Sequence, residues 1–458
     1  MTASTAELPP PSGAAATRRA IWNTIRGSLG NLVEWYDVYV YTVFAPYFEA
    51  QFFDKNDSNS TLYIYAIFAV TFVMRPVGSW FFGRYADRRG RKAALVFSVT
   101  LMSACSFLVA IMPTREILGY WAAVILILAR LLQGFATGGE YGTSATYMSE
   151  AATARRRGFL SSFQYVTLVG GHVLAQLTLL IALSVLDVEK INAWGWRIGF
   201  FIGGIAALVV LWIRRSMDES LSESHLQAIR EGKDQDAGSL KALFTTYWRP
   251  LLLVFLITAG GTVAFYTYTV NAPAIVKSTF GSDRAMTATW INLLGLIFLM
   301  LLQPVGGLIS DRVGRKTLLV FFGVGGVIYT YILLTFLPQT TSPLMAFTFT
   351  AVGYVIITGY TSVNAIVKAE LFPAEIRALG VGLGYALANS AFGGTAPMLF
   401  QAAKRAHHPG WFIFYVTAVI AVSLLVYIFA LKNKGITVLD REQGSAWEVP
   451  VPSPASPR

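Results

Sequence analysis

The sequence predicts an all-α membrane protein with twelve transmembrane helices in two six-helix bundles, and three observations indicate this fold. Apolar residues make up 55% of the 458 residues and charged residues only 13%, whereas soluble domains carry about a quarter charged residues. The apolar residues gather in blocks of about 20, the length that crosses a bilayer core of about 30 Å. Two motifs also recur, once in each half of the chain. This composition excludes an ordinary soluble enzyme, a disulfide scaffold and a disordered chain.

Each apolar block is a candidate transmembrane helix. The blocks are rich in Gly, Leu, Val, Ile and Phe, and they lack the alternating pattern of β-barrel strands. Several exceed the minimum length, which indicates tilted or bent helices. The predicted spans are 27–50, 61–83, 93–112, 118–148, 159–186, 197–214, 249–274, 287–309, 317–337, 344–367, 378–402 and 411–431.

Polar segments divide the chain into five parts. The N-terminal segment has no apolar stretch long enough for a signal peptide, so we expect it to stay in the cytoplasm. The end of the chain, from residue 443, has the composition of a disordered tail. The predicted order is a disordered cytoplasmic tail 1–20, an N-terminal bundle 21–214, a cytoplasmic linker 215–248, a C-terminal bundle 249–431 and a cytoplasmic tail 432–458.

The basic residues are distributed unevenly between the two sides of the predicted membrane protein. Most of the 36 Lys and Arg residues fall in loops on the side of the N-terminus. Because basic loops stay in the cytoplasm, both termini are predicted to be cytoplasmic. The net charge of +11 then faces anionic membrane lipids and not nucleic acid. We expect a multi-pass protein of the bacterial inner (plasma) membrane that functions as a monomer.

Two motifs occur in equivalent loops of both halves. The pattern G-x-x-x-D-R-x-G-R-K stands at 83–92 and at 307–316, each time after the second span of a half. Glu150 and Glu370 each precede an arginine in the loop after the fourth span. Such parallel repeats relate two bundles by an axis along the membrane normal, and the bundles rock around a site near the midplane.

These motifs resemble those of the major facilitator superfamily, as does R-x-x-Q-G at 130–134. Longer strings resemble its metabolite:proton symporters: GNLVEWYDVYVY (30–41), FVMRPVGSWFFGRYADRRGRK (72–92) and LLQGFATGGEYGTSATYMSE (131–150). The likeness runs from about residue 18 to residue 432. The resemblance implies alternating access and proton-coupled import of an organic acid, either α-ketoglutarate or a related dicarboxylate. It implies no cofactor, with the proton as the coupling ion.

Two alternatives stay open. The same fold could carry another metabolite, namely β-ketoadipate, an aromatic acid, shikimate or a betaine. A non-transporting membrane sensor is a second alternative, which the short tails disfavour. We do not expect an enzyme or an ATP-driven pump, since the sequence has no G-x-x-x-x-G-K-[ST] phosphate loop. One cysteine and four scattered histidines form no metal-ligand pattern.

Acidic residues within the predicted spans are candidates for proton coupling, because a charge in the bilayer core costs several kcal/mol. Glu34 and Asp37 are three residues apart and therefore share one helix face. The resemblance to sugar:proton symporters suggests that Asp37 pairs with Arg130 and releases it on protonation. A permanent salt bridge is the alternative. Glu34 could carry the proton instead, while Glu140 could relay it inward or hold helices together.

Arg75 is the leading candidate for substrate binding, because a guanidinium matches a carboxylate with two parallel hydrogen bonds. A dicarboxylate needs a second group, which Arg130 or His172 could supply. Arg75 could instead pair with an acidic residue, and His172 could simply take part in hydrogen-bonded packing. The candidates in the C-terminal half are uncharged: Tyr266, Tyr360 and Asn389.

The repeated loops predict a cytoplasmic gate. An aspartate recurs beside arginines in both copies, and such networks can latch two halves together in an outward-open state. The predicted gate residues are Asp87, Arg91, Glu150, Asp311, Arg315 and Glu370. Lys368 stands near the end of the tenth span, and we expect its side chain to extend toward the membrane surface.

Overall fold

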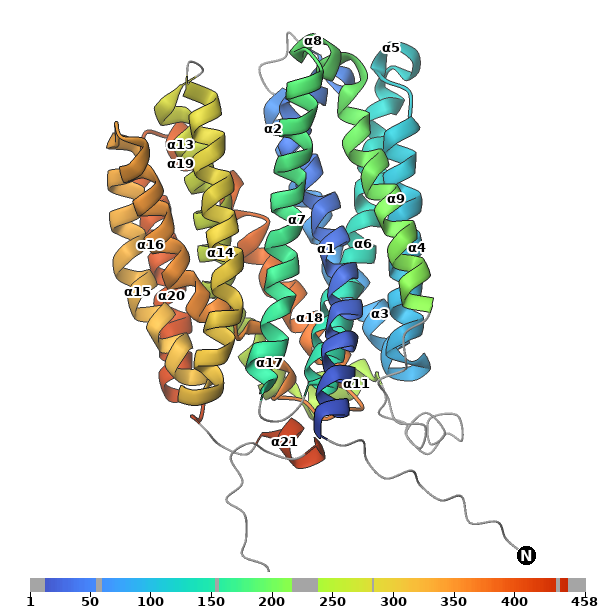
Figure 1. Ribbon diagram of the computed structural model, residues 1–458, viewed down its shortest axis with the longest axis vertical. Coiled ribbons are helices and arrows are strands. Elements are labelled where there is room, and N and C mark those ends of the chain that lie inside the picture. The colour runs from blue at the N-terminus through green and yellow to red at the C-terminus, as the bar shows by residue number, and fades with distance from the viewer. Residues whose placement is uncertain are drawn as a thin grey trace, which may run out of the picture.

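The computed structural model describes residues 13–54, 60–152, 156–215, 238–281, 284–433 and 437–443. Within these ranges the chain forms helices and connecting turns, without a strand. The long helices stand side by side along the longest axis, with those of the two halves on opposite sides (Figure 1).

The N-terminal half consists of long helices joined by short connections. The turn between its third and fourth helices lies at Gly90, whose φ of 102° favours glycine. The helices are α1 (Gly13–Phe52), α2 (Ser60–Val73), α3 (Arg75–Arg89), α4 (Arg91–Ile111), α5 (Arg115–Leu118), α6 (Tyr120–Ala151), α7 (Arg157–Val185), α8 (Val188–Lys190), the π-helical η2 (Ile191–Gly195) and α9 (Trp196–Arg215).

The C-terminal half repeats this plan. Gly314 has a φ of 95° at the position equivalent to Gly90. Its helices are α11 (Leu240–Thr245), α12 (Trp248–Tyr266), η3 (Thr267–Asn271), α13 (Ala272–Phe280), α14 (Ala285–Val313), α15 (Arg315–Phe336), η5 (Leu337–Gln339), α16 (Pro343–Thr361), α17 (Asn364–Ala369), α18 (Arg377–Ala388), η6 (Asn389–Gly393), α19 (Ala396–Arg405), α20 (Pro409–Phe429) and α21 (Val438–Gln443).

Ten helical stretches in the described part of the chain are long and apolar enough to cross a membrane. They correspond to ten of the twelve predicted spans. The predicted span 27–50 lies inside α1, and the predicted span 378–402 is divided between α18, η6 and α19. In that last region a π-helical turn at Asn389–Gly393 interrupts the α-helix, and such turns are frequent at functional sites.

The predicted tails differ from the structure in two places. Helix α1 begins at Gly13, inside the segment 1–20 that we expected to be disordered, because the Ala-rich stretch favours a helix. Within the predicted tail 432–458, the short helix α21 packs with Leu439 fully buried. Residues 1–12, 216–237 and 444–458 of the predicted tails and linker lie outside the described residues.

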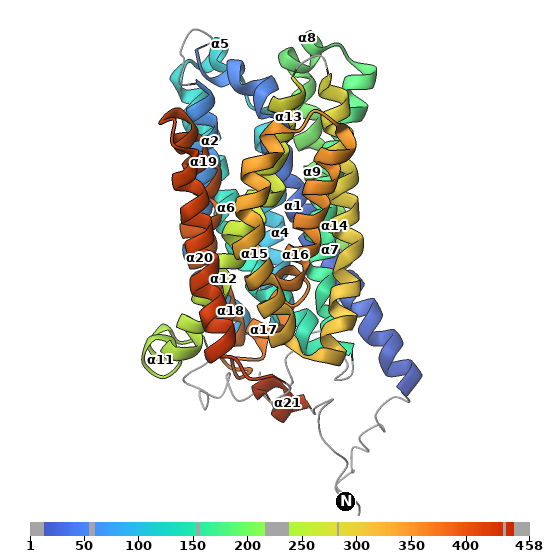
Figure 2. The same cartoon turned by 90° about the vertical axis from the view of Figure 1, so that its left-hand side faces the viewer.

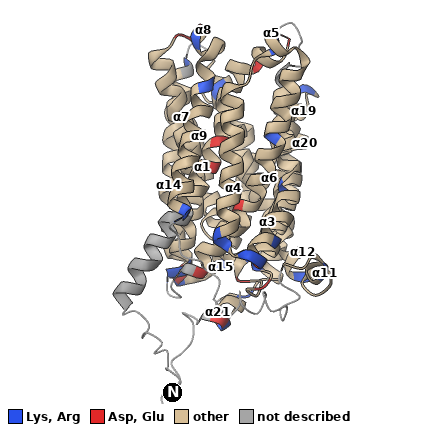
Figure 3. Cartoon of the chain, turned by 90° about the vertical axis from the view of Figure 1, so that its right-hand side faces the viewer, with Lys and Arg blue, Asp and Glu red and all other residues tan. Residues whose placement is uncertain are grey.

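The two halves meet most closely at one end of the molecule, which we call the basic end. It holds α11, α17 and α21 (Figure 2), and many of the Lys and Arg residues lie there (Figure 3). Helix α7 packs on α14, while α3 and α6 pack on α18. A Cβ atom built on Gly142 would lie 2.5 Å from the Cα atom of Gly382, so the two backbones are in direct contact.

Candidate functional site

The site is centred on a buried arginine of α3. Arg75 is 2% exposed, and its Nε and Nη2 atoms have no hydrogen-bond partner among the described residues. Its guanidinium lies 4.0 Å from the ring centre of Phe72 and 5.0 Å from that of Trp35. Aromatic faces attract the cation but leave its N–H groups free. A buried guanidinium with free donors is suited to binding an anion.

Other buried polar groups without partners surround this arginine. Among the described residues, neither carboxylate oxygen of Glu34 has a hydrogen-bond partner, and Arg75 is close enough to influence its charge. Tyr266 lies beside Arg75 and Asn389, and in the same part of the chain its hydroxyl and both polar atoms of the Asn389 side chain have no hydrogen-bond partner. Buried polar atoms are normally paired. Their number here indicates a site for a polar ligand, and it contains three predicted substrate residues: Arg75, Tyr266 and Asn389.

A pair of stacked tyrosines joins the two halves toward the basic end. The rings of Tyr141 on α6 and Tyr385 on α18 are 3.5 Å apart and nearly parallel. Lys368 lies over both rings, with its Nζ atom 4.3 Å from the centre of Tyr385 and 5.0 Å from that of Tyr141. Lys368 is 0% exposed. The prediction that it extends to the membrane surface is therefore wrong, because α17 turns its side chain inward between the halves.

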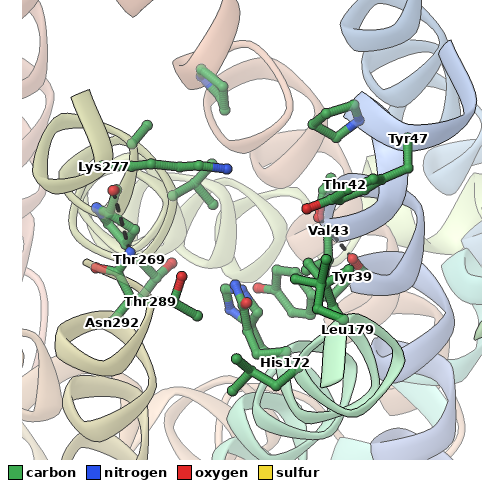
Figure 4. A pocket seen from close by; sticks show the side chains of 18 of the residues that line it. Tyr39, Thr42, Val43, Tyr47, His172, Leu179, Thr269, Lys277, Thr289 and Asn292 are labelled. Atoms are coloured by element: carbon green, nitrogen blue, oxygen red, sulfur yellow. Dashed lines mark hydrogen bonds between the residues drawn. The ribbon is translucent and has the colours of Figure 1, made fainter. Parts of the chain in front are cut away.

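A cavity of about 310 Å³ lies between the halves, toward the end opposite the basic end. Tyr39 and His172 lie on one side of it, and Lys277 reaches across from α13 (Figure 4). The rings of Tyr39 and His172 are stacked at 3.8 Å. Tyr39 also contacts Trp35, with ring centres 5.7 Å apart. These contacts link the cavity to the surroundings of Arg75.

Asp37 and Arg130 form a pair within the N-terminal helices, as the sequence predicted. Their closest charged atoms, Oδ2 and Nη1, are 3.7 Å apart. Asp37 also accepts hydrogen bonds from Ser106 at 2.5 Å and from Gln133 at 2.7 Å. Arg130 donates to Gln133 at 2.7 Å and lies over the ring of Tyr41. Arg130 is thus engaged in a network of its own, separate from the groups around Arg75.

Glu140 pairs with an arginine that stands at the end of the predicted span 197–214. Arg214 is 0% exposed and forms a salt bridge with Glu140. Its Nη1 atom donates to Oε2 of Glu140 at 2.8 Å, and Ser98 donates to the same oxygen at 3.1 Å. The guanidinium lies directly against Gly30, where a side chain would collide with it. This geometry favours the interpretation that Glu140 holds α4, α6 and α9 together.

Tyr360 is buried inside the C-terminal helices. Its ring packs against Gly261 and Phe322, and its hydroxyl has no hydrogen-bond partner among the described residues. Within the described part of the chain, no three His, Cys, Asp or Glu side chains gather as a metal ion would require.

The first repeated loop contacts the C-terminal half at the basic end. Asp87 pairs with Arg91 and accepts a hydrogen bond of 3.1 Å from the backbone N–H of Leu379, in the first turn of α18. Arg91 also lies 3.5 Å from Glu150. Glu150 in turn accepts a hydrogen bond of 2.8 Å from Arg377.

The second repeated loop makes the equivalent contact with the N-terminal half. Asp311 accepts hydrogen bonds from the backbone N–H groups of Gly158 at 2.8 Å and Phe159 at 2.9 Å, in the first turn of α7. Arg315 pairs with Asp311 at 2.8 Å and with Glu370 at 3.5 Å. Burial raises the pKa of Glu370, although the Arg315 guanidinium opposes this shift. All six predicted gate residues therefore lie in two equivalent networks.

Helix α21 forms ion pairs with both halves, next to these networks. Asp440 pairs with Arg157 of α7, and Glu442 pairs with Arg377 of α18. Glu442 also accepts a hydrogen bond of 3.1 Å from the backbone N–H of Ala374. This helix lies in a segment predicted to be a tail. A signal was present in Thr437, an N-capping residue type directly before the apolar Val438 and Leu439.

This arrangement defines a membrane transport protein: two helical halves surround a buried charged site and are latched at one end. The chain belongs to the sugar (and other) transporter family, whose model matches residues 23–222 and 213–443. It is 43% identical over 420 residues to the alpha-ketoglutarate permease of Escherichia coli (strain K12), which covers 92% of this chain and 95% of the relative.

Two further relatives carry other cargo. The citrate-proton symporter of Klebsiella pneumoniae is 30% identical, covering 82% of this chain and 84% of the relative. The proline/betaine transporter of Escherichia coli (strain K12) is 27% identical, and the alignment covers 86% of this chain and 80% of the relative.

Solved structures confirm the predicted twelve-helix fold of the major facilitator superfamily. The proton:xylose symporter XylE bound to 6-bromo-6-deoxy-D-glucose superposes with a TM-score of 0.78 at 19% identity, covering 94% of this chain and all of that chain. The inward-open form of XylE from E. coli gives a TM-score of 0.64 at 21% identity, covering 93% and 100%.

Proposed function

We propose that this protein imports an organic acid with two carboxylates, such as α-ketoglutarate, together with protons, by alternating access. The observation that carries the proposal is the buried Arg75, whose unpartnered N–H groups lie among further unpartnered polar groups between the halves. The 43% identity to an alpha-ketoglutarate permease supports this substrate. No cofactor is needed, since the proton gradient supplies the free energy.

The coupling proton is carried by Glu34 in this proposal. Asp37 and Glu140 are each held by an arginine and by hydroxyl or amide groups. Glu34 is 1% exposed, and no described residue donates a hydrogen bond to either of its oxygens, so its neutral form suits this site best. Deprotonated Glu34 would attract Arg75 and compete with the substrate carboxylate. Protonation removes that competition, and proton and anion therefore bind together.

The Asp37–Arg130 pair is a second coupling element. Its 3.7 Å separation is long for a salt bridge, and Nε and Nη2 of Arg130 have no hydrogen-bond partner among the described residues. Protonation of Asp37 would release Arg130 and change the packing of α1 on α6, as the sequence suggested.

The two six-helix bundles, 21–214 and 249–431, are the parts that move in this mechanism. The closed basic end and the cavity at the opposite end describe a state open away from the basic end. We place the basic end and both termini in the cytoplasm of a bacterial cell, following the distribution of Lys and Arg. Both halves of the site come from one chain, which supports a functional monomer.

Uptake of labelled α-ketoglutarate into liposomes containing the purified protein tests the proposal. We expect accumulation with an inward proton gradient and much slower uptake without it, at a fixed membrane potential. Counterflow with citrate, shikimate and a betaine identifies competing cargo. Failure to transport any organic acid under either condition would refute the transporter function, and uptake indifferent to the gradient would refute proton coupling.

A further inference from the structure

We propose that Lys368 is the second cationic group of the substrate site and, with Arg75, selects acids that carry two carboxylates. The inference rests on the proposed transport of an organic acid and adds a residue from the opposite half of the molecule. Arg75 belongs to α3 and Lys368 to α17, so a bound dianion would connect the two halves.

The environment of Lys368 favours the binding of an anion. Its side chain is 0% exposed, and no carboxylate pairs with it in the described part of the chain. Its Nζ atom donates a hydrogen bond of 3.2 Å to the hydroxyl of Tyr141 and lies over the rings of Tyr141 and Tyr385. The two rings offset only part of the cost of burying an ammonium group. Such a charge is stabilised fully when an anion binds beside it.

The hydrogen bonds around Lys368 leave donors without acceptors. The hydroxyl oxygen of Tyr141 accepts from Lys368 and also from Nδ2 of Asn364 at 2.7 Å. A phenol oxygen has two lone pairs, so both are used and its O–H is left as a donor. An ammonium group has three donors, and the Tyr141 hydroxyl takes one of them. Neighbouring donors that are not used by the described residues can bind a carboxylate.

Arg75 and Lys368 lie on either side of the same group of α6 and α18 residues, so we place them at two ends of one substrate site. The backbone carbonyl of Arg75 is in contact with Gly138, because a Cβ atom there would collide with it. Tyr141, which holds Lys368, follows Gly138 by three residues on the same helix, about 4.5 Å along its axis. Tyr385 contacts Lys368 through its ring and is also close enough to Arg75 to be influenced by that charge. The two cations therefore share one neighbour.

The consequence is a selectivity that no single arginine provides. A monocarboxylate can occupy the guanidinium and leave the ammonium buried without a counter-charge. A dicarboxylate can neutralise both cations and satisfy the Tyr141 hydroxyl. Specificity therefore arises from the additional stabilisation that only a second carboxylate supplies.

The test compares Lys368→Met with the wild type in proteoliposomes, using labelled α-ketoglutarate and its monocarboxylate analogue 2-oxopentanoate. We expect the KM for α-ketoglutarate to rise about 10- to 100-fold in the variant, because a charge-assisted contact is lost. The KM for 2-oxopentanoate should change less than about threefold, so the preference for the dicarboxylate disappears. Lys404→Met, at an exposed lysine of α19, is the matched control and should leave both unchanged.

Thermal stability separates this role from a structural one. Removing a buried, uncompensated charge should leave the melting temperature of Lys368→Met in detergent unchanged or raised, whereas loss of a structural contact would lower it. An equal effect on both substrates, or none on either, would overturn the assignment of Lys368 while leaving organic acid transport intact. If Lys368→Met misfolds, Lys368→Gln provides the same comparison. Absence of transport in the wild type would instead refute the underlying function.

Discussion

The carboxylate of Asp440, in the last helix of the described chain, accepts a hydrogen bond of 2.6 Å from the guanidinium of Arg157 at the start of α7. The two side chains are 7% and 2% exposed. The same helix holds Arg377 of the C-terminal half through Glu442. A segment expected to be a tail therefore bridges the two halves at the basic end.

Replacing Asp440 with Asn should loosen the closed basic end. The substitution weakens a buried charge-assisted hydrogen bond, an effect of about tenfold on the equilibrium between closed and open states. Maleimide labelling of Ser149→Cys, a buried position next to Glu150, measures the opening after the buried native Cys105 is changed to Ala. We expect labelling about tenfold faster in Asp440→Asn. The exposed Asp187, changed to Asn, serves as control, and an unchanged labelling rate in Asp440→Asn would show that α21 does not hold the gate.

Replacing Glu34 with Gln should uncouple transport from the proton gradient. Gln cannot release a proton and does not attract Arg75, so substrate binding persists while the gradient loses its effect. We expect counterflow of α-ketoglutarate to continue and gradient-driven accumulation to stop. Asp37→Asn is the comparison: if it alone abolishes the response to the gradient while Glu34→Gln accumulates substrate normally, then Asp37 carries the proton.

Replacing Glu140 with Gln should destabilise the N-terminal helices. Arg214 would remain buried without its counter-charge, and breaking a buried pair in this way costs about 3–5 kcal/mol. Thermal denaturation in detergent measures the loss, and the double variant Glu140→Gln/Arg214→Met should recover part of it. A variant as stable as the wild type but with an altered pH dependence of uptake would favour the proton relay instead.

We predict that His172 contributes to substrate affinity through the stacking of its ring and not through its imidazole nitrogens. Its stacking on Tyr39 at the edge of the cavity is worth about 0.5–1.5 kcal/mol, so His172→Ala should raise the KM for substrate by about 2- to 10-fold. His172→Phe keeps an aromatic ring and should remain near the wild type. If Phe proves as harmful as Ala in uptake assays, the imidazole nitrogens contribute directly to substrate or proton binding.

Features encoded in local composition could be predicted from the sequence. Apolar length gave the spans, and the repeated loop motifs led to Asp87 and Asp311. Both aspartates lie in equivalent networks because the motif also contains the glycine with positive φ that turns the chain. The pairing of Asp37 with Arg130, which the resemblance to sugar:proton symporters suggested, is present in the structure.

Arg214 and Lys368 could not be located in this way. Both stand at the ends of predicted spans, where basic residues usually face water, and linear position does not reveal the direction of a side chain. The direction depends on partners elsewhere in the chain: Arg214 turns inward against Gly30, and Lys368 turns inward toward the stacked rings of Tyr141 and Tyr385. These are tertiary relationships, and they determine which charges are buried.

The two aspartates of the repeated loops have a consequence for how the molecule opens. Asp87 binds the first turn of α18 in the other half, and Asp311 binds the first turn of α7 in the other half. Each half thus supplies a hydrogen-bond acceptor for backbone N–H groups that the first turn of a helix in the other half leaves unpaired. Because both contacts join the same two halves, we expect them to break together when the basic end opens. A carrier that opens in this way would have no half-open form through which protons could leak without cargo.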